Sequence, residues 1–436
     1  MSTATISPTS AEPTPETEEY DVAIVGAGYV GLPLATVFAE AGRRVLLLDS
    51  SPNRVQAIRR AQSYIEDVPS EQLQSLVGET LFASTNYEQL RSADAIVIAL
   101  PTPLSAQREP DLSIVIGATR EIAARLRPGQ LVVLESTTYP GTTREVLLPI
   151  LETSGLEVGV DFNLAFSPER VDPGRTDWTT KTVPKIVGGV TPECTERART
   201  LYAGAVDTVH TVSAPEAAEL TKLLENIFRS VNIALVNELA QLCDRMSIDV
   251  WEVVDAAATK PFGFMPFQPG PGLGGHCIPI DPFYLTWKAR EHDFYTEFIE
   301  LAGKVNENMP YYCRSVVAGS LDRQRGIALS RARVQVLGVA YKAGVADVRE
   351  SPALKLISLL QEAGAEVAFH DPYVGEIEEL GLVSQPLAPE AYDAVVIVTA
   401  HPEIDYGQLV ERARLVVDFR NATGEAGRRA ENVRRL

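Results

Sequence analysis

One cysteine stands in the segment PGPGLGGHCIPIDP, residues 269–282, where glycine and proline leave few side chains to cover it. Cys277 follows a glycine pair and His276, and Asp281 comes four residues later. A thiolate in such a setting can act as a nucleophile, whereas a thiol packed inside a loop would be only a small apolar residue. We therefore treat Cys277 as a candidate nucleophile.

A nucleophilic thiol is useful when the oxidation of an alcohol must continue past the aldehyde. Thiolate attack on the aldehyde gives a thiohemiacetal, and removal of its hydride leaves a thioester that water hydrolyses. A nearby cation would stabilise the oxyanions of these steps, and a carboxylate could position or activate water. The candidates for these roles are Lys222, Asn226, Asp281 and Glu169.

A hydride acceptor is indicated near the N-terminus, where the strand-like run DVAIV leads into GAGYVG, residues 26–31, and then a helical pattern. Gly26 would make the tight turn, Gly28 would let a pyrophosphate approach the backbone, and Gly31 would let the helix pack on the strand. A second strand, RRVLLLD, ends in Asp49, which can bind the adenosine ribose hydroxyls and would repel a 2′-phosphate. The pattern predicts NAD rather than NADP, and the alternative is a glycine-rich turn in another α/β protein.

A helical pattern of roughly 30 residues, about 45 Å long, begins near residue 215. Its length exceeds that of a simple crossover, so it could join two domains. Its apolar residues run almost all the way round, which predicts burial on most faces. Lys222 and Asn226 share one face of this helix, and a buried ammonium is costly without a purpose or a partner. An ordinary ion pair with Glu219 or Glu225 is the alternative.

Further apolar runs at residues 95–100 and in LVVLESTTYPGTT alternate with helical patterns, which predicts a parallel, doubly wound α/β sheet. Three hydroxyl residues, Thr102, Ser136 and Thr137, follow these strands. Ligands bind at the carboxyl ends of strands in such sheets. A turn or a helix cap would explain a hydroxyl at these positions equally well.

A second α/β unit begins at RVQVLGVAYK and includes the strand EVAFHDP, which ends at Asp371, and the strands DAVVIVTA and ARLVVDFRN. It lacks the GxGxxG glycines, so it should not bind a second dinucleotide in the same manner. Lys342, Arg349 and Arg420 lie at or just after strand ends, where they suit phosphate or carboxylate recognition or are surface charges. The expected fold class is α/β, with two Rossmann-like domains joined by a long central helix.

Composition limits the partners of this 436-residue chain, whose length favours two or three domains. The net charge of -19 would repel a nucleic-acid backbone, and no apolar run is long enough to span a membrane. The four cysteines lack metal-ligand spacing, which predicts reduced thiols in the cytoplasm and no metal site. Residues 1–19 are rich in Ser, Thr, Pro and Glu, which predicts a disordered tail rather than a signal peptide.

The chain resembles the UDP-glucose/GDP-mannose dehydrogenase family from about residue 20 to 425. The segments that carry the resemblance are, in order, IVGAGYVGLPLA, LPTPL, ESTTYPGTT, FSPERVDPG, KLLENIFRSVNIALVNELA, GGHCIPIDP, LGVAYKAGVADVRESPA and DFRN. The resemblance implies that two NAD oxidise the C6 alcohol of a nucleotide sugar to a uronic acid. It also implies a homodimer, with the long helix partly at the interface.

Roles follow from the resemblance residue by residue. Cys277 matches the family's nucleophile, Lys222 and Asn226 match the residues that hold the reacting oxygens, and Asp281 matches the aspartate after the cysteine. Glu169 and Thr137 match the pair that handles water. The implied dinucleotide contacts are Gly26, Gly28, Tyr29, Val30, Gly31, Asp49, Arg54, Thr102, Thr137 and Arg349. The implied substrate contacts are Glu169, Lys222, Asn226, Phe267, Gly274, Lys342 and Arg420, with a sugar-binding loop at residues 266–274.

The cysteine segment also bears on the sugar. We interpret its glycines as room for the nucleotide sugar beside Cys277. The form HCIPIDP, preceded by PFGFMPFQPGPG, resembles the bacterial branch of the family that oxidises UDP-GlcNAc or UDP-ManNAc. UDP-glucose dehydrogenases typically have FGGSC at this place, with a lysine at the position of Ile280. His276 would point away from Cys277 in an extended segment, which favours a structural role over that of a base.

Three other functions stay as alternatives. A UDP-glucose 6-dehydrogenase would use the same chemistry on a different sugar. A non-catalytic NAD-binding protein predicts that the nucleophile or the lysine is missing, and both are present. A single-step β-hydroxyacid dehydrogenase explains neither Cys277 nor the second α/β unit.

The expected domains are an NAD-binding domain at residues 20–212 and a central helical region with the cysteine loop at residues 213–322. A C-terminal domain at residues 323–436 is expected to bind the nucleotide sugar.

Overall fold

The computed structural model describes residues 19–65, 67–105, 109–171, 177–275 and 278–436. These residues form two compact units. The first unit extends to Thr102 and includes Leu112–Thr137 and Gly141–Glu219, and the second comprises Pro103–Asp111, Thr138–Pro140 and Leu220–Leu436. Nearly all of the predicted tail, with His276 and Cys277, lies outside the described residues.

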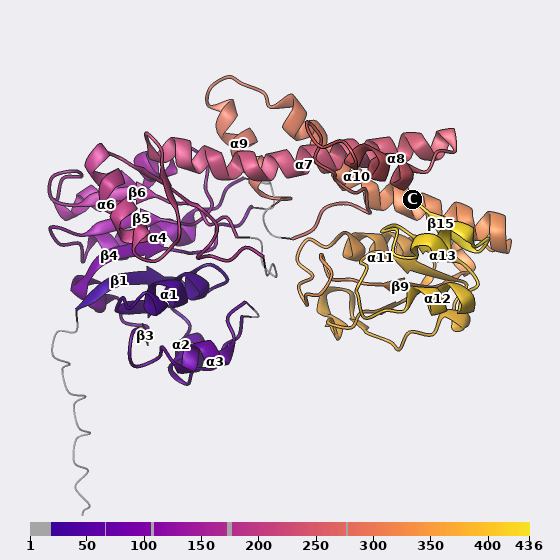
Figure 1. The fold of residues 1–436 in the computed structure, drawn as a ribbon, viewed down its shortest axis with the longest axis horizontal. Coiled ribbons are helices and arrows are strands. Elements are labelled where there is room, and N and C mark those ends of the chain that lie inside the picture. Colours follow the sequence, from indigo (N-terminus) through magenta and orange to yellow (C-terminus); the bar gives the residue numbers. More distant parts are fainter. Residues whose placement is uncertain (1–18, 66, 106–108, 172–176, 276–277) are drawn as a thin grey trace, which may run out of the picture. The chain divides into compact units, whose positions relative to one another are not determined.

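The first unit is built on an eight-stranded sheet in the order β3-β2-β1-β4-β5-β6-β7-β8 (Figure 1). Neighbouring strands are parallel, as predicted, except β6 and β7, which are antiparallel. The strands are β1 Tyr20–Val25, β2 Val45–Leu48, β3 Leu81–Ser84, β4 Ala93–Ile98, β5 Leu131–Leu134, β6 Asn163–Phe166, β7 Lys185–Gly189 and β8 Val209–Thr211. Strand order reverses at β1, between β2 and β4, which is where ligands bind in open α/β sheets.

Helices cover both faces of this sheet. They are α1 Gly31–Glu40, α2 Pro52–Arg59, α3 Ser70–Gln74, α4 Ser113–Ala123, α5 Leu148–Leu151 and α6 Pro192–Ala203. Successive residues of β1 belong to two different hydrophobic cores, one on each face of the sheet: Ile24 packs in one and Val25 in the other. Both faces of the strand are therefore buried, and the predicted doubly wound architecture is confirmed.

The second unit joins helices to a five-stranded, all-parallel sheet in the order β10-β9-β13-β14-β15. Its strands are β9 Arg333–Leu337, β10 Glu366–His370, β13 Ala394–Ile397, β14 Val416–Asp418 and β15 Val433–Arg435, with a small hairpin of β11 Glu376–Ile377 and β12 Leu382–Val383. Its later helices are α8 Val250–Ala258, α9 Asp281–Arg290, α10 Glu297–Ser320, α11 Pro352–Glu362, α12 Tyr406–Arg412 and α13 Gly424–Arg429. The second Rossmann-like domain is thus confirmed.

The long helix α7 spans Pro215–Met246, as the sequence predicts. The expectation that it is buried on most faces holds except on one side. An apolar stripe stays exposed within the chain, formed by Leu220, Leu224, Phe228, Leu235, Leu239, Leu242 and Met246. These residues follow one another at intervals of three, four or seven, so they lie on one side of the helix. No helix among the described residues is both long and apolar enough to cross a membrane.

Candidate active site

The glycine turn after β1 has a separate steric reason for each glycine. Gly26 has a φ of 109°, and a Cβ there would lie 2.4 Å from the carbonyl oxygen of Ala99. A Cβ on Gly31 would lie 1.7 Å from the carbonyl oxygen of Gly26, so α1 packs on the turn only because Gly31 has no side chain. At Gly28, by contrast, no atom lies within 4 Å of the Cβ position. The backbone is open there, as a dinucleotide pyrophosphate requires.

Asp49, directly after β2, ties the neighbouring segments together. Its carboxylate accepts hydrogen bonds from the backbone amides of Ala27 at 2.9 Å and Ser51 at 2.8 Å, and from the Arg54 guanidinium at 3.4 Å. Tyr64 donates its hydroxyl to the carbonyl of Ala27, and burial together with the charge of Asp49 raises the pKa of Tyr64 to about 12. The turn and the acidic strand end fit the adenosine part of NAD, with Arg54 half-exposed beside them.

The hydroxyl residues after β4 and β5 contact one another's backbone. Thr102 donates its hydroxyl to the carbonyl of Thr137 at 2.7 Å, and Ser136 accepts from the amide of Leu100 at 2.9 Å. The structure therefore brings Thr102 and Thr137 together. Both Thr102 and Ser136 stabilise the loops by hydrogen bonds to the backbone, which agrees with the alternative that such hydroxyls only stabilise turns.

Glu169 belongs to a largely buried group of three charges in the first unit. Lys185, the first residue of β7, forms an ion pair with Glu135, which directly follows β5. The same ammonium lies 3.3 Å from Glu169, whose other oxygen accepts the amides of Arg170 and Val171 at 2.8 and 2.7 Å. Lys185 and Glu135 are almost wholly buried, so Glu169 is held in place by a charged core.

Burial controls the titration of this group. Desolvation raises the pKa of Glu135 to about 7, opposed by the charge of Lys185. Desolvation lowers the pKa of Lys185, but the two carboxylates outweigh it and the net shift is upward. The sequence analysis missed both residues, although a lysine at the start of the apolar run KIVGG was a usable signal.

Glu219, one of the two alternative partners for Lys222, has other partners in the structure. Its carboxylate accepts from the amide of Gly141 at 2.6 Å, and from the amide and hydroxyl of Thr143 at 2.9 and 2.7 Å. Despite these hydrogen bonds, desolvation raises its pKa to about 7. Glu219 therefore anchors the turn that follows Thr137.

Lys222, Asn226 and Asp281 form a buried cluster in the second unit, as their predicted roles require. All three are less than a tenth exposed. Asn226 donates its side-chain amide to Asp281, the first residue of α9, and its oxygen accepts from Arg229. Desolvation raises the pKa of Asp281 to about 6, and the charge of Lys222 is the largest opposing influence. An ammonium, an amide and a carboxylate thus share one solvent-poor site.

The loop before the cysteine is anchored on α7 by its backbone. Gly270 donates its amide to Asn237 at 2.9 Å, and Asn237 in turn binds Asn306 of α10. The ring of Phe267 packs edge-on against Phe228, with ring centres 5.7 Å apart. The loop is therefore fixed by buried amide hydrogen bonds and an aromatic contact.

The interpretation of the glycines as room for a ligand is wrong at four positions. A Cβ on Gly270 would lie 2.5 Å from the Arg420 guanidinium, and Cβ atoms on Gly274 and Gly275 would lie 2.7 and 2.9 Å from Tyr341. The Cβ position of Gly272 is likewise crowded by the chain itself. These glycines allow close packing by the protein's own side chains, and contact of Gly274 with substrate stays a prediction.

The predicted basic residues of the second domain have three different environments. Lys342 is half-buried in the loop after β9. Arg349 makes a bidentate ion pair with Asp347, with Nε 3.0 Å from Oδ1 and Nη2 2.5 Å from Oδ2. Arg420 follows β14 and packs on Gly270, and desolvation lowers its pKa. Arg420 and the cysteine loop are thus brought together within this unit.

Replacing Lys185 by Met should destabilise the protein in a pH-dependent way. The variant keeps Glu135 and Glu169 without their cation, so we expect a loss of ~3–5 kcal/mol in the free energy of unfolding at pH 8. The loss should be smaller at pH 6, where Glu135 is largely protonated because its pKa is about 7. Urea unfolding at both pH values measures this. The exposed Lys181→Met is the control, and an equal loss at both pH values would contradict the prediction.

Asp281→Asn should remove a pH dependence of stability. The pKa of Asp281 is raised from 3.8 to about 6 in the folded protein, so the folded state binds this proton more tightly than the unfolded state. The stability that the wild type draws from this proton is complete below pH 4 and lost as pH rises through 6. We expect the wild type to lose about 2 kcal/mol relative to Asp281→Asn between pH 4 and pH 7. Parallel stability curves in urea unfolding would refute this, and Asp255→Asn, at an exposed site, is the control.

Comparison with known proteins follows the same division of the chain. Residues 20–206 match the NAD binding domain of the UDP-glucose/GDP-mannose dehydrogenase family, residues 216–308 its central domain, and residues 335–425 its UDP binding domain. The first match indicates NAD as the cofactor.

Relatives match over nearly the whole chain. Protein CapL of Staphylococcus aureus is 36% identical and the match covers 92% of this chain and 95% of CapL. A UDP-N-acetyl-D-glucosamine 6-dehydrogenase of Pseudomonas aeruginosa is 35% identical, and the match covers 88% of this chain and 92% of that enzyme. The solved structure of a UDP-D-ManNAc dehydrogenase from Pyrococcus horikoshii superposes with a TM-score of 0.86 at 34% identity, covering 95% of this chain and 98% of that one. This chain is an NAD-dependent dehydrogenase that belongs to the UDP-glucose/GDP-mannose dehydrogenase family.

Proposed function

We propose that this enzyme oxidises the C6 alcohol of a UDP-N-acetylhexosamine, UDP-GlcNAc or UDP-ManNAc, to the uronic acid. The observation that carries the proposal is the buried cluster of Lys222, Asn226 and Asp281, whose Asp281 opens the helix four residues after Cys277. A buried ammonium beside a carboxylate of raised pKa suits a reaction in which negative charge develops on oxygen. A binding protein without chemistry gives no reason to bury these groups together.

NAD supplies the oxidising power, since it accepts one hydride in each of the two oxidations. In the first, Lys222 and Asn226 hold the C6 oxygen while the alcohol loses a hydride and a proton to become the aldehyde. The Cys277 thiolate then adds to the aldehyde carbon, and the oxyanion of the thiohemiacetal is stabilised by Lys222. Loss of a second hydride leaves a thioester. Water, oriented by Glu169 and Thr137, releases the carboxylate and regenerates the thiol.

The remaining contacts are proposed from the same resemblance. Gly26, Gly28, Tyr29, Val30, Gly31, Asp49, Arg54, Thr102, Thr137 and Arg349 would hold NAD. The open backbone at Gly28 supports this assignment most directly. Phe267, Gly274, Lys342 and Arg420 would bind the nucleotide sugar, and the placement of Arg420 against Gly270 supports a joint role for the loop and the C-terminal domain.

The acetamido sugar is favoured over glucose by two observations. The relatives that match over most of the chain include enzymes named for UDP-GlcNAc and UDP-ManNAc. The cysteine segment carries His276 and Ile280. The motif typical of UDP-glucose dehydrogenases has a serine and a lysine at these two positions. UDP-glucose is the second candidate because the chemistry at C6 would be identical.

The stoichiometry and the nucleophile are tested together. The purified enzyme is assayed with NAD and UDP-GlcNAc, UDP-ManNAc, UDP-glucose or GDP-mannose, and NADH and uronate are both quantified. We expect two NADH per sugar, and a kcat/KM for an acetamido sugar at least tenfold above that for UDP-glucose. Cys277→Ser should lower uronate formation by about three orders of magnitude. Cys243→Ser is the matched control, because Cys243 is a buried free thiol on α7.

Each outcome bears on a different part of the proposal. One NADH per sugar would replace the four-electron reaction by a single oxidation. A preference for UDP-glucose would move the substrate to the second candidate. Undiminished uronate formation by Cys277→Ser would remove the thiol from the chemistry.

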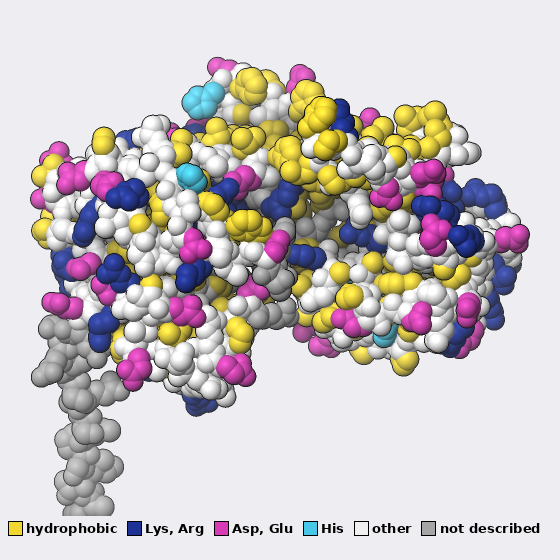
Figure 2. Space-filling model, in the orientation of Figure 1, with side chains coloured by type: hydrophobic (Ala, Val, Ile, Leu, Met, Phe, Trp, Pro, Cys, Tyr) yellow, Lys and Arg dark blue, Asp and Glu magenta, His cyan; other side chains and the backbone are white. Residues whose placement is uncertain are grey.

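A homodimer is proposed from the apolar stripe of α7. Leu224 is 62% exposed and Met246 58% exposed, and the stripe runs from one end of the helix to the other. Figure 2 shows hydrophobic side chains gathered over the part of the molecule where Figure 1 draws α7 and α8. Exposed apolar patches of this kind mark protein interfaces, and closed two-fold symmetry is the commonest way to bury one. A second copy of this chain is the proposed occupant.

Replacing Leu239 and Leu242 by Lys should convert the dimer to a monomer. Two charges in an apolar interface leave unpaired groups desolvated, so association should weaken by at least a hundredfold. Sedimentation at micromolar concentration should give twice 47.4 kDa for the wild type and 47.4 kDa for the double variant. Val160→Lys, on an exposed residue of the first unit, should stay dimeric. A monomeric wild type would refute the proposal.

A cytoplasmic location is proposed from the cysteines. Cys194, Cys243 and Cys313 are buried and free. Free thiols are typical of a reducing compartment.

A further inference from the structure

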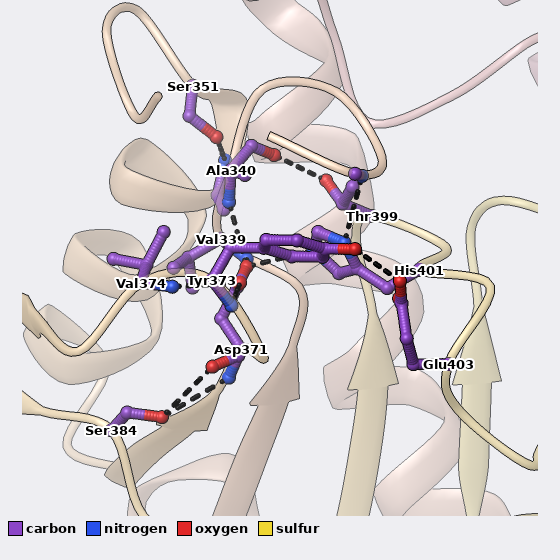
Figure 3. Close-up of polar contacts among 12 residues, drawn as sticks. Val339, Ala340, Ser351, Asp371, Tyr373, Val374, Ser384, Thr399, His401 and Glu403 are labelled. Carbon is purple, nitrogen blue, oxygen red and sulfur yellow. Dashed lines mark hydrogen bonds and ion pairs between the residues drawn. The ribbon is translucent and has the colours of Figure 1, made fainter. Parts of the chain in front are cut away.

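A buried aspartate and a buried histidine meet at the carboxyl end of the second sheet, one after the edge strand β10 and the other after the central strand β13 (Figure 3). Asp371 directly follows β10, and His401 lies in the segment after β13. Both side chains are inaccessible to solvent, and the Nε2 atom of His401 lies 3.0 Å from Asp371 Oδ2. The pair lies outside every role assigned to the reaction.

Asp371 corresponds in topology to Asp49 of the first unit, but it accepts more hydrogen bonds from the protein. Oδ2 accepts the amides of Val339 and Ala340 at 2.7 and 3.1 Å as well as His401. Oδ1 accepts the amides of Tyr373 and Val374 at 2.9 and 3.2 Å. Desolvation raises the pKa of Asp371, but these hydrogen bonds outweigh it and the net pKa is lowered. Asp371 is therefore an anion held by protein donors rather than a ligand for a ribose.

His401 is fixed as one neutral tautomer by its two partners. The amide of Gly344 donates to Nδ1 at 3.2 Å, so Nδ1 carries no proton. The proton is then on Nε2, which donates to Asp371. The ring of Tyr373 lies against the imidazole, with centres 5.2 Å apart, and covers it from one side (Figure 3).

Asp371 and His401 bind the loop after β9 on both sides of Lys342. On one side the amide of Ala340 binds Asp371, and its carbonyl accepts the hydroxyl of Thr399 at 2.6 Å. On the other side Gly344, with a φ of 77°, binds His401. Lys342 lies midway between the two anchored residues. The backbone on which Lys342 stands is thus set by the buried pair.

The same loop supports the segment that leads to the cysteine. The side chain of Tyr341 packs on Gly274 and Gly275 so closely that a Cβ on either glycine would lie less than 3 Å from it. Gly275 also donates its amide to the carbonyl of Arg349 at 3.0 Å. The loop therefore connects the buried pair to the residues just before His276.

We propose that His401 is a positioning residue that, together with Asp371, holds the loop of residues 339–344 so that Lys342 binds the nucleotide part of the substrate. The proposal rests on the proposed function, because it takes Lys342 as a nucleotide-sugar contact. His401 itself touches no substrate. Its effect on binding is exerted through the backbone on either side of Lys342.

The test is a double-mutant cycle on the binding of UDP, measured by calorimetry with the full-length protein. Lys342→Met should weaken UDP binding at least tenfold, and His401→Leu at least fivefold. The double variant should bind UDP within twofold of Lys342→Met, because His401 acts through Lys342 and the two losses do not add. NAD affinity should change by less than twofold in all three.

Two further variants separate positioning from general damage to the domain. His401→Gln can accept from Gly344 through its oxygen and donate to Asp371 through its nitrogen, so UDP affinity should return to within threefold of the wild type. His370→Leu, on a histidine at the end of β10 whose Nδ1 contacts only the carbonyl of Gln385 in the described hydrogen bonds, should bind UDP like the wild type. If His401→Leu does not fold, Thr399→Val takes its place in the cycle, since it removes only the hydroxyl that binds Ala340.

The outcomes distinguish this inference from the function on which it rests. A wild type that does not bind UDP, or a Lys342→Met variant that binds it normally, would overturn the proposed substrate site and this inference with it. Normal binding by His401→Leu, or additive losses in the double variant, would overturn the inference alone.

Discussion

The cost of burying a carboxylate is the constraint on which both units depend. Acidic residues directly follow or end several parallel strands, among them Asp49 after β2, Glu135 after β5, Asp371 after β10 and Asp418 at the end of β14. Asp418, for example, accepts the amides of Arg420, Ala422 and Thr423. Each buried charge must find partners, which for Asp49, Asp371 and Asp418 are mainly amides and side chains of the adjacent loops, and for Glu135 is Lys185 of β7. The requirement to satisfy the carboxylate thereby fixes the loops at the carboxyl ends of the strands.

The two Rossmann-like units use the same position in different ways. In the first unit Asp49 accepts two amides and a half-exposed arginine, and the glycine turn beside it leaves the backbone open at Gly28. In the second unit Asp371 accepts four amides and a buried histidine, and a loop bearing Lys342 stands where the glycine turn would be. The first arrangement leaves a cradle for a dinucleotide. The second converts the acidic strand end into the anchor of a loop, which is why similar topology does not imply a second NAD site.

Most of the fold and part of the site could be predicted from the sequence because they follow from local patterns. Apolar runs predicted the central strands, and the spacing of Lys222 and Asn226 predicted that both lie on one face of a helix. The partners of Glu169 and Asp371 could not be predicted: KIVGG marks Lys185 as a lysine in a buried strand, but Lys185 and His401 find their partners only through tertiary structure. The prediction that the glycines before Cys277 leave room for a ligand was wrong for the same reason. A glycine leaves space, but only the tertiary structure shows that Tyr341 fills it.

The helix α7 shows why periodicity alone does not determine burial. Its apolar residues surround the axis, yet its sides meet different environments. Lys222 and Asn226 lie among buried charges, Asn237 binds the loop at Gly270, and the apolar stripe stays exposed in the described chain. A polar group on a buried side and apolar groups on an exposed side reverse the usual rule for a surface helix. The proposed function accounts for both reversals: the buried polar side would serve the reaction, and the exposed apolar side would bind a second copy of the chain.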